Sequence, residues 1–246
     1  MDKIKKIFSV LSLLLFVFSC SASPYKVDYG SSLKVSEGRK IIKEKNEEMI
    51  LVKRSIFVKS NTVFDGKNKV YVWSGPGECN QTEGQKPVFI LYSNSILKNA
   101  YISNSPEGIH IKGNNILIDN IVNLGVCEDA ISTRIRGEFV GLKIINSTFM
   151  NCEDKAIQMN KGVDVEIINN KFINCHIPIR VTVADNVKIT NNYAHGCKIF
   201  VNSGPRVKNL NLGNNKENCK HRIQEAEDFS VSDLDYDIIN EYKKKQ

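Results

Sequence analysis

The feature that most constrains this chain is a repeat of about 22 residues, in which a short apolar strand leads to an asparagine. Four segments align, LKIINSTFMNC, VEIINNKFINC, VKITNNYAHGC and LNLGNN, and two more, ILKNAYISN and ILIDNIVNLGVC, fit less regularly. The shared asparagines are Asn99, Asn120, Asn146, Asn169, Asn191 and Asn214, at spacings of 21, 26, 23, 22 and 23 residues. No unit has room for a strand and a helix, and no helical period runs through the segments.

A period of this length, made of short strands and polar corners, predicts an all-β fold: a single-stranded right-handed parallel β-helix. Each coil would pair with the coils above and below it, about 4.8 Å away. We expect the asparagines to form an internal ladder at one corner, because Asn tolerates the left-handed conformation and bonds its neighbours. A leucine-rich repeat is the alternative, but the chain lacks its fixed leucine spacing and its helical half.

The cysteines follow the asparagines at a nearly fixed distance. Cys152, Cys175 and Cys197 each lie six residues after their asparagine, and Cys127 lies seven after. They should therefore stack on successive coils, within reach of disulfide formation. Buried reduced thiols are the other interpretation.

The ends of the chain differ from the repeats. A basic start followed by an apolar run from Ile7 to Phe18 predicts a cleaved export signal at 1–22, since the run is short for a membrane span. In a bacterial source, Cys20 of VFSC would instead carry a lipid anchor at the cell surface. The remaining predicted parts are a charged cap or linker at 23–54, a β-helix at 55–216 and a polar tail at 217–246.

The chain of 246 residues has a formal net charge of +7, with 41% hydrophobic and 25% charged residues. These proportions are typical of a soluble globular protein. A basic surface suits a polyanion such as an acidic polysaccharide, and no internal run of Lys and Arg indicates a nucleic-acid site. We expect an extracellular monomer that binds no nucleic acid.

Carboxylates recur in register with the asparagines. Counting eight residues past three successive asparagines reaches Glu107, Glu128 and Asp154, and Asp129 lies one position away. On stacked coils these acids would lie about 5 Å apart on one face. Like charges that close repel one another unless they are compensated.

The repulsion between these acids can be compensated in two ways. Ca²⁺ accepts several carboxylate oxygens in flexible geometry, which suits a row of acids on a rigid sheet. Alternatively, Lys155 and Arg180 pair with the acids and no metal binds. Acids beside basic groups would suit an acidic sugar in either case.

The chain resembles the polysaccharide lyase family 3 pectate lyases. The matching stretches are VFDGKNKVYVW, EGQKPVFILYSNSILKNAYI, PEGIHIKG, VCEDAIS and CEDKAIQMN, and the resemblance covers residues 55–215. It implies a secreted enzyme that cleaves polygalacturonate by Ca²⁺-dependent β-elimination. It also implies that the calcium ligands are Glu107, Glu128, Asp129 and Asp154.

The chemistry of β-elimination suggests roles for the basic residues. A base must remove the C5 proton beside the uronate carboxylate, and a lysine near other cations can do so. We therefore predict that Lys155 is the base and that Arg180 binds the substrate. Arg180 is the second candidate for the base. His110 follows the acid of EGIH, and either binds substrate or fills a structural role.

One residue departs from the family pattern. Where the family has Lys-Leu-Tyr-Arg, this chain has Ile-Pro-Ile-Arg, so Ile177 replaces a lysine and Arg180 is kept. The loss of a cation favours a second hypothesis, a non-catalytic β-helix that binds acidic polysaccharide. The third hypothesis is a glycoside hydrolase. Such an enzyme would need paired acids and would give saturated products.

Overall fold

The computed structural model describes residues 48–77, 84–134 and 139–225, and every regular element in these ranges is a β-strand. The predicted export signal, the lipidation site, most of the cap and the end of the tail lie outside the described residues. No helix within the described ranges is long and apolar enough to cross a membrane. The strands are β1 (Met49–Val52), β2 (Ile56–Val58), β3 (Val63–Trp73), β4 (Pro87–Leu91), β5 (Ile96–Ser103), β6 (Glu107–Ile111), β7 (Ile116–Asn123), β8 (Asp129–Thr133), β9 (Leu142–Ile145), β10 (Thr148–Met150), β11 (Lys155–Ile168), β12 (Lys171–Ile173), β13 (Ile177–Thr190), β14 (Tyr193–Asn211) and β15 (Lys216–Glu225).

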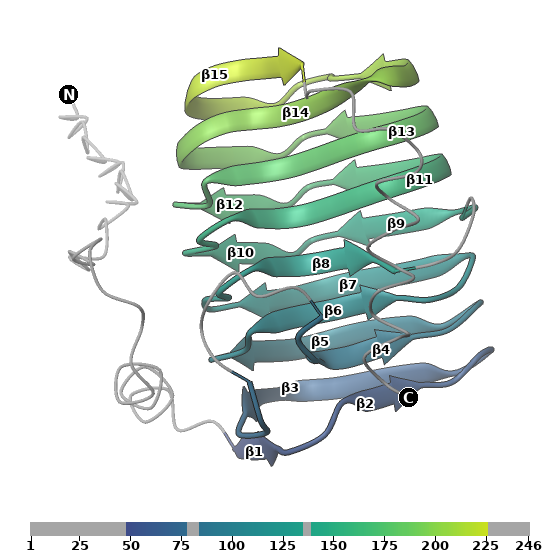
Figure 1. Cartoon of the computed structure of the whole chain (residues 1–246), viewed down its shortest axis with the longest axis vertical. Helices are drawn as coiled ribbons and strands as arrows, with labels where there is room; N and C mark the ends of the chain where they lie inside the picture. The colour runs from purple at the N-terminus through teal and green to yellow at the C-terminus, as the bar shows by residue number, and fades with distance from the viewer. Residues whose placement is uncertain (1–47, 78–83, 135–138, 226–246) are drawn as a thin grey trace, which may run out of the picture. The chain divides into compact units, whose positions relative to one another are not determined.

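The strands stack in parallel rows rather than in hairpins (Figure 1). One row runs β2, β4, β6, β8, β11, β13 and β14, and another runs β1, β3, β5, β7, β10, β12 and β14. Each pairing between described strands is parallel, and its partners belong to successive repeats, as between β11 and β13. The predicted parallel β-helix is therefore confirmed. Its strands begin at Met49 and end at Glu225, so they reach beyond the predicted limits of 55–216.

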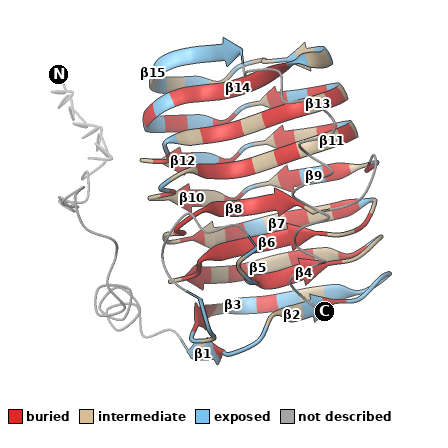
Figure 2. Ribbon diagram, in the orientation of Figure 1, coloured by how far each residue is buried: buried red, intermediate tan, exposed pale blue. Residues whose placement is uncertain are grey.

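The inward-facing apolar residues of successive coils form one core along the axis (Figure 2). Ile109, Ile131, Ile157 and Ile179, for example, occupy equivalent positions on four successive strands and are all completely buried. Stacking identical side chains removes apolar surface from water at every coil, at about 25 cal/mol per Å². The β-helix is thus stabilised along its whole described length and gives a rigid support for outward-facing groups.

The repeated asparagines occupy exposed corners, so the expected internal ladder is wrong in its location. All six have positive φ, between 51° and 59°, the left-handed conformation that Asn tolerates. Side-chain amides of neighbouring coils bond one another, with Asn120 Nδ2 donating to Asn99 Oδ1 at 2.8 Å and Asn169 Nδ2 to Asn146 Oδ1 at 2.7 Å. We call Asn99, Asn120, Asn146 and Asn169 the outer asparagine ladder.

The internal ladder is formed by the next residue of each repeat: Ser147, Asn170, Asn192 and Asn215. Asn192 is 2% exposed, and its Nδ2 donates to Asn215 Oδ1 at 3.0 Å and to the Ile167 carbonyl at 2.9 Å. Its Oδ1 accepts from the backbone N–H of Asn170 at 2.8 Å. This inner ladder therefore satisfies backbone groups that the corner would otherwise bury without partners.

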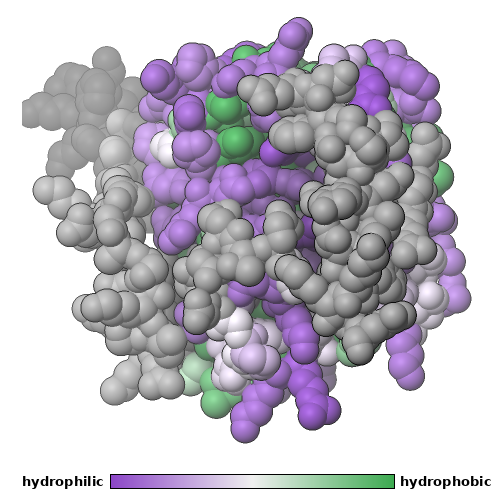
Figure 3. Space-filling model, viewed as in Figure 1, coloured by the Kyte–Doolittle hydropathy of each residue, from purple (hydrophilic) through white to green (hydrophobic). Residues whose placement is uncertain are grey.

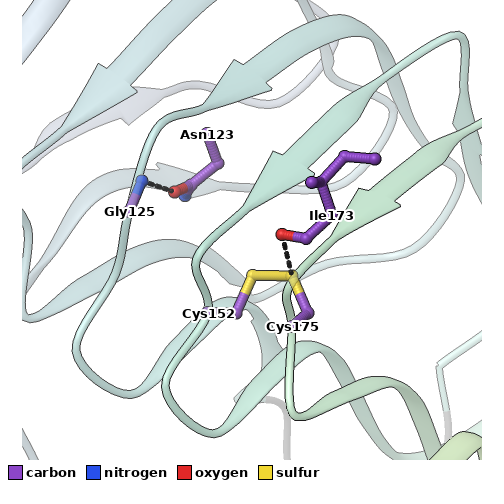
Figure 4. Close-up of a disulfide and its surroundings, with 5 residues drawn as sticks. All are labelled: Asn123, Gly125, Cys152, Ile173 and Cys175. Atoms are coloured by element: carbon purple, nitrogen blue, oxygen red, sulfur yellow. Dashed lines mark hydrogen bonds between the residues drawn. A yellow bond between two sulfur atoms is a disulfide. The ribbon is translucent and has the colours of Figure 1, made fainter. Parts of the chain in front are cut away.

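The predicted cysteine stack is confirmed for Cys152, Cys175 and Cys197, which form disulfides, whereas Val126 rather than Cys127 pairs with Cys152. Cys152 bonds Cys175, with Cα atoms 4.3 Å apart, and Cys197 bonds Cys219, with Cα atoms 4.6 Å apart. Figure 4 shows the first of these between neighbouring coils. Each disulfide therefore joins one coil to the next.

Candidate active site

The charged residues of the site lie in one column along the row of β6, β8, β11 and β13. Lys155 pairs in register with Asp129 on one side and with Ile177 on the other. Ile109 pairs with Ile131, and the same register two residues earlier places Glu107 opposite Asp129. Each of these residues is the first of its strand, so the turn before the strand ends at the column. We call Glu107, Asp129 and Lys155 the ionic column.

The prediction that Glu107, Glu128 and Asp154 share one column is wrong by one residue. Ser105 pairs with Val126 before the strands begin, yet Ile109 pairs with Ile131 within them. The second coil therefore has one extra residue in this turn. A fixed count from the asparagines cannot detect it, because the count assumes turns of equal length. Glu128 and Asp154 consequently lie one position before the ionic column.

Burial of the ionic column is nearly complete. Glu107 is 0% exposed, Asp129 1% and Lys155 7%. Burying a charge costs several kcal/mol unless it is paired and hydrogen-bonded. Each member of the column must therefore have compensating partners nearby.

Glu107 is compensated by two bases. Its Oε2 lies 2.5 Å from His110 Nε2, and its Oε1 lies 3.3 Å from a terminal nitrogen of Arg134. Burial alone would raise the pKa of Glu107, but the neighbouring His110 and Arg134 outweigh burial and hold that pKa below its usual value. Glu107 is therefore a charged acid whose two oxygens already have partners.

Asp129 is compensated less fully. Lys155 Nζ lies 3.4 Å from its Oδ1, and Ser132 Oγ donates to its Oδ2 at 2.8 Å. Burial still raises the pKa of Asp129 to about 6, with the nearby charge of Glu107 adding to the rise. Its Oδ1 is buried and accepts no hydrogen bond from the described residues, so Lys155 balances the charge of Asp129 without satisfying this oxygen.

Lys155 connects the ionic column to the position before it. Its Nζ contacts Asp154 Oδ2 as well as Asp129, and the Asp154 side chain is 31% exposed. A single ammonium group thus balances a buried and a half-buried carboxylate. The pairing of acids with Lys155, one of the two compensations expected from the sequence, is present in the structure.

Arg134 is a site residue that the sequence reasoning missed. It pairs with Glu107 and lies 4.0 Å from Glu128 Oε1, so it links two of the predicted calcium ligands. It immediately follows β8, two residues beyond Ser132, and residues two apart in a strand point to the same side. The alternation in DAISTR could have placed Arg134 beside the acids once the register was known.

The predicted substrate-binding residues lie farther along the strands. His110, Gln158 and Arg180 occupy one register column, joined through Ser132. His110 is buried against Glu107, whereas Arg180 is half-buried two coils beyond Ser132. The structure therefore groups His110 with the acids, and places Arg180 on the same row of strands, three residues past Ile177.

The carboxylates suit calcium by chemistry but do not form a finished cage. Glu128, Asp129 and Asp154 offer hard oxygen ligands of the kind that Ca²⁺ takes. Within the described ranges, however, no three His, Cys, Asp or Glu side chains are grouped closely enough to hold a metal ion. Lys155 Nζ occupies the space between two of these acids, so a bound cation would have to replace its contacts.

Comparison with known proteins identifies relatives of the chain. A family model described as pectate lyase matches residues 40–224. Probable pectate lyase E of Aspergillus clavatus is 34% identical over 65% of this chain, and Pectate lyase E of Emericella nidulans is 34% identical over 64%. Probable pectate lyase D of Emericella nidulans is 38% identical over 45% of the chain and 41% of its own length. The chain spans 61% of the length of the two E-type relatives.

Proposed function

Because the chain belongs to the pectate lyase family, we propose that it cleaves polygalacturonate by calcium-dependent β-elimination and releases unsaturated oligogalacturonides. We further propose that it acts as an exported monomer, free or anchored at the cell surface through Cys20. The observation that carries the activity is the position of Lys155 between Asp129 and Asp154, beside a buried carboxylate oxygen that accepts no hydrogen bond.

The residues that would hold calcium are Glu128, Asp129 and Asp154. Glu107 is the fourth predicted calcium ligand, but its two oxygens already accept hydrogen bonds from His110 and Arg134. Bound calcium would neutralise these acids and, on the uronate carboxylate, stabilise the negative charge that develops at C5.

Lys155 is the proposed base. β-Elimination removes the proton at C5 and then breaks the bond between C4 and the glycosidic oxygen. An amine can accept that proton only when it is neutral and no longer bound by two carboxylates. The 9% exposure of the Lys155 side chain keeps water away from the nitrogen, which favours proton transfer from the sugar rather than from solvent.

Arg180 is proposed to bind a substrate carboxylate. A guanidinium stays charged at any pH the enzyme meets and can donate two parallel hydrogen bonds to a carboxylate. Arg180 is half-buried on β13, on the same row of strands as Lys155. It would thus fix the orientation of the uronan while Lys155 reacts, and it remains the second candidate for the base.

One assay tests the function directly. Purified protein is incubated with polygalacturonate at alkaline pH, with Ca²⁺ or with a chelator, and the absorbance of the unsaturated product is followed. We expect product only with Ca²⁺, and none from Lys155→Ala. Calcium-dependent product that persists in Lys155→Ala would remove Lys155 as the base, and absence of product from every uronan would remove the lyase activity.

A second candidate is a non-catalytic β-helix that binds acidic polysaccharide. The observation that favours it is Ile177, which follows Lys155 in register where a further cation would be expected. A binder of this kind would retain polygalacturonate in a sedimentation or affinity-gel assay without releasing unsaturated product. The two candidates therefore give opposite results in the absorbance assay.

A further inference from the structure

A row of basic residues lies on the turns that carry the disulfides. His176, Lys198 and Lys220 each directly follow a disulfide-bonded cysteine, on three successive coils. All three residues are exposed. The turn at Cys175, which Figure 4 shows, carries the first of them. We call His176, Lys198 and Lys220 the basic row.

The strand register places the basic row in line with a predicted calcium ligand. The register of β11 and β13, taken one residue before the strands, puts Asp154 opposite His176. The backbone N–H of Lys198 donates to the His176 carbonyl at 3.0 Å. The residues on either side of Lys198 pair with those on either side of Lys220, so the two lysines lie opposite each other. Because neighbouring coils are about 4.8 Å apart, the row continues the site along the solenoid axis.

The two lysines of the row have no carboxylate that balances them within the part of the chain that the structure describes. Neither Lys198 nor Lys220 forms an ion pair there, and Glu217, the acid nearest to Lys220 along β15, pairs with Arg222 at 3.6 Å. Lys143, also exposed, has an acid on the neighbouring coil at 2.8 Å. Like charges directly opposite each other on paired strands are destabilising. A ligand with several negative charges would therefore interact favourably with both lysines at once.

The disulfides hold the turns of the basic row at a fixed spacing. Cys197 and Cys219, the residues before the two lysines, are bonded to each other with Cα atoms 4.6 Å apart. The cysteine before His176 is bonded to the preceding coil with Cα atoms 4.3 Å apart. The backbone of the row is thus ordered before any ligand arrives, which lowers the entropy cost of binding.

The basic row matches a polymer that carries one carboxylate on every sugar. A uronan chain aligned with the solenoid axis would pass from the ionic column over the row, so sugars beyond the reacting one would lie near the lysines. The ammonium groups of Lys198 and Lys220 can donate to carboxylates, and His176 can donate an N–H to a carboxylate or a hydroxyl in either protonation state. In Figure 3, the end of the solenoid formed by β14 and β15 is mainly hydrophilic, as such a surface requires.

We propose that His176, Lys198 and Lys220 bind the uronan chain beyond the sugar that reacts. This inference rests on the proposed action on a uronan and adds a preference for chain length to it. Long polygalacturonate reaches both the reacting position and the basic row, whereas a short oligogalacturonide reaches only part of this surface. The row therefore makes the polymer the better substrate.

The experiment compares kcat and KM for polygalacturonate and for trigalacturonate at one fixed Ca²⁺ concentration. Lys198→Gln/Lys220→Gln removes both charges and keeps polar side chains. Each exposed ion pair contributes modestly, so the loss of two should raise KM for the polymer about fivefold, with kcat nearly unchanged. Trigalacturonate is too short to cover the reacting position and the whole row, so its kinetics should change little.

A matched control removes the same charge elsewhere on the same end of the solenoid. Lys171 and Lys216 are exposed, and both pair in register with Tyr193, on the other row of strands. Lys171→Gln/Lys216→Gln should leave KM for both substrates unchanged. Thermal unfolding of the two double variants checks that each of them folds.

A polymer KM for Lys198→Gln/Lys220→Gln equal to that of the wild type, or an equal rise in the control, would overturn the role of the basic row. An equal rise in KM for trigalacturonate would also overturn it, because the lysines would then act at the reacting sugar. If neither substrate gives product, the proposed lyase function fails instead. Electrophoresis in gels that contain polygalacturonate then decides the row: weaker retention than the control supports it, and equal retention overturns it.

Discussion

The outer asparagine ladder and the ionic column run along the same coils, but they satisfy their polar groups differently. The ladder consists of amides at surface corners, each of which donates to a side chain of the coil before: Asn169 donates to Asn146 at 2.7 Å, and Asn146 donates to Asp119 at 2.9 Å. The column consists of buried charges, and Asp129 retains a carboxylate oxygen with no hydrogen bond from the described residues. Both are stacked polar rows, yet only in the ladder are nearly all the polar side-chain groups hydrogen-bonded.

The difference indicates which row serves folding and which serves chemistry. Stacked amides bond one another without net charge, so they stabilise coils wherever the repeat places them. Stacked carboxylates repel, and at Asp129 burial adds a cost that Lys155 and Ser132 offset only in part. A row that costs stability is expected to contribute to a function, and variants of the two rows should therefore affect different measurements.

The largest expected effect is on activity, from Lys155→Met. A positioned base contributes about 10²–10⁴-fold, so kcat should fall by that amount while the fold persists. Lys143→Met is the matched control: Lys143 is 49% exposed and pairs with Glu166 on the neighbouring coil at 2.8 Å. Initial rates of unsaturated product formation measure both variants. If the two variants lose activity equally, the ionic column has no special role.

Variants of the disulfides Cys152–Cys175 and Cys197–Cys219 distinguish effects on coil stacking from effects on site geometry. Both close loops of similar length, with sequence separations of 23 and 22, so removing either should lower the free energy of unfolding by about 3 kcal/mol. Cys152 lies directly before the turn that carries Asp154 and Lys155, whereas Cys197 lies beyond the ionic column.

We therefore expect Cys152→Ser/Cys175→Ser to weaken calcium binding severalfold, and Cys197→Ser/Cys219→Ser to leave it unchanged. Urea unfolding measures the stability, and calorimetric titration with Ca²⁺ measures the affinity. Equal calcium affinities in the two double variants would show that the first disulfide acts on stability alone.

The fold could be predicted from the sequence because each coil repeats the same local chemistry. Asn146 and Asn169 mark equivalent corners, and Cys152 and Cys175 follow at the same distance, so periodicity alone predicted the β-helix and the stacking of these cysteines but did not decide between disulfides and thiols. The predicted acid register and the predicted position of the asparagine ladder were wrong, because one turn has an extra residue and the corner asparagines lie on the surface. The extra residue before Asp129 shifted the acid register, and the corner asparagines proved to point outward.

Interactions between coils were the part that periodicity could not supply. Arg134 reaches Glu107 on the preceding coil, and no count along one repeat indicates which coil a long side chain will contact. Likewise, the sequence showed an acid and a lysine together in CEDK, but not that Lys155 also binds Asp129 of the coil before. Side-chain pairing depends on the register of the strands, which one inserted residue changes.

Asp129 should make the calcium-free protein sensitive to pH. Its pKa is raised to about 6 in the folded protein, above its ordinary value of 3.8, so the folded state binds the proton more tightly than the unfolded state. This contribution to stability is fully present below about pH 4 and is lost as the pH rises through 6. Two pKa units correspond to about 3 kcal/mol.

Asp129→Asn cannot ionise and should not show this loss. With a chelator present, the variant is expected to gain up to about 3 kcal/mol relative to the wild type between pH 4 and pH 8. Urea unfolding at both pH values measures the change. A difference in stability that is the same at the two pH values would mean that burial does not raise this pKa.

The smallest effects come from two adjacent asparagines of one corner. Asn191 is exposed with φ of 58°, so Asn191→Gly keeps the left-handed conformation and should cost a few tenths of a kcal/mol. Asn192 is 2% exposed, and Asn192→Ala would leave the Ile167 carbonyl and the Asn170 N–H buried without their partner. That change should cost about 2 kcal/mol. Thermal unfolding of both variants measures the difference; similar losses would mean that the inner ladder contributes no more to stability than the corner residue beside it.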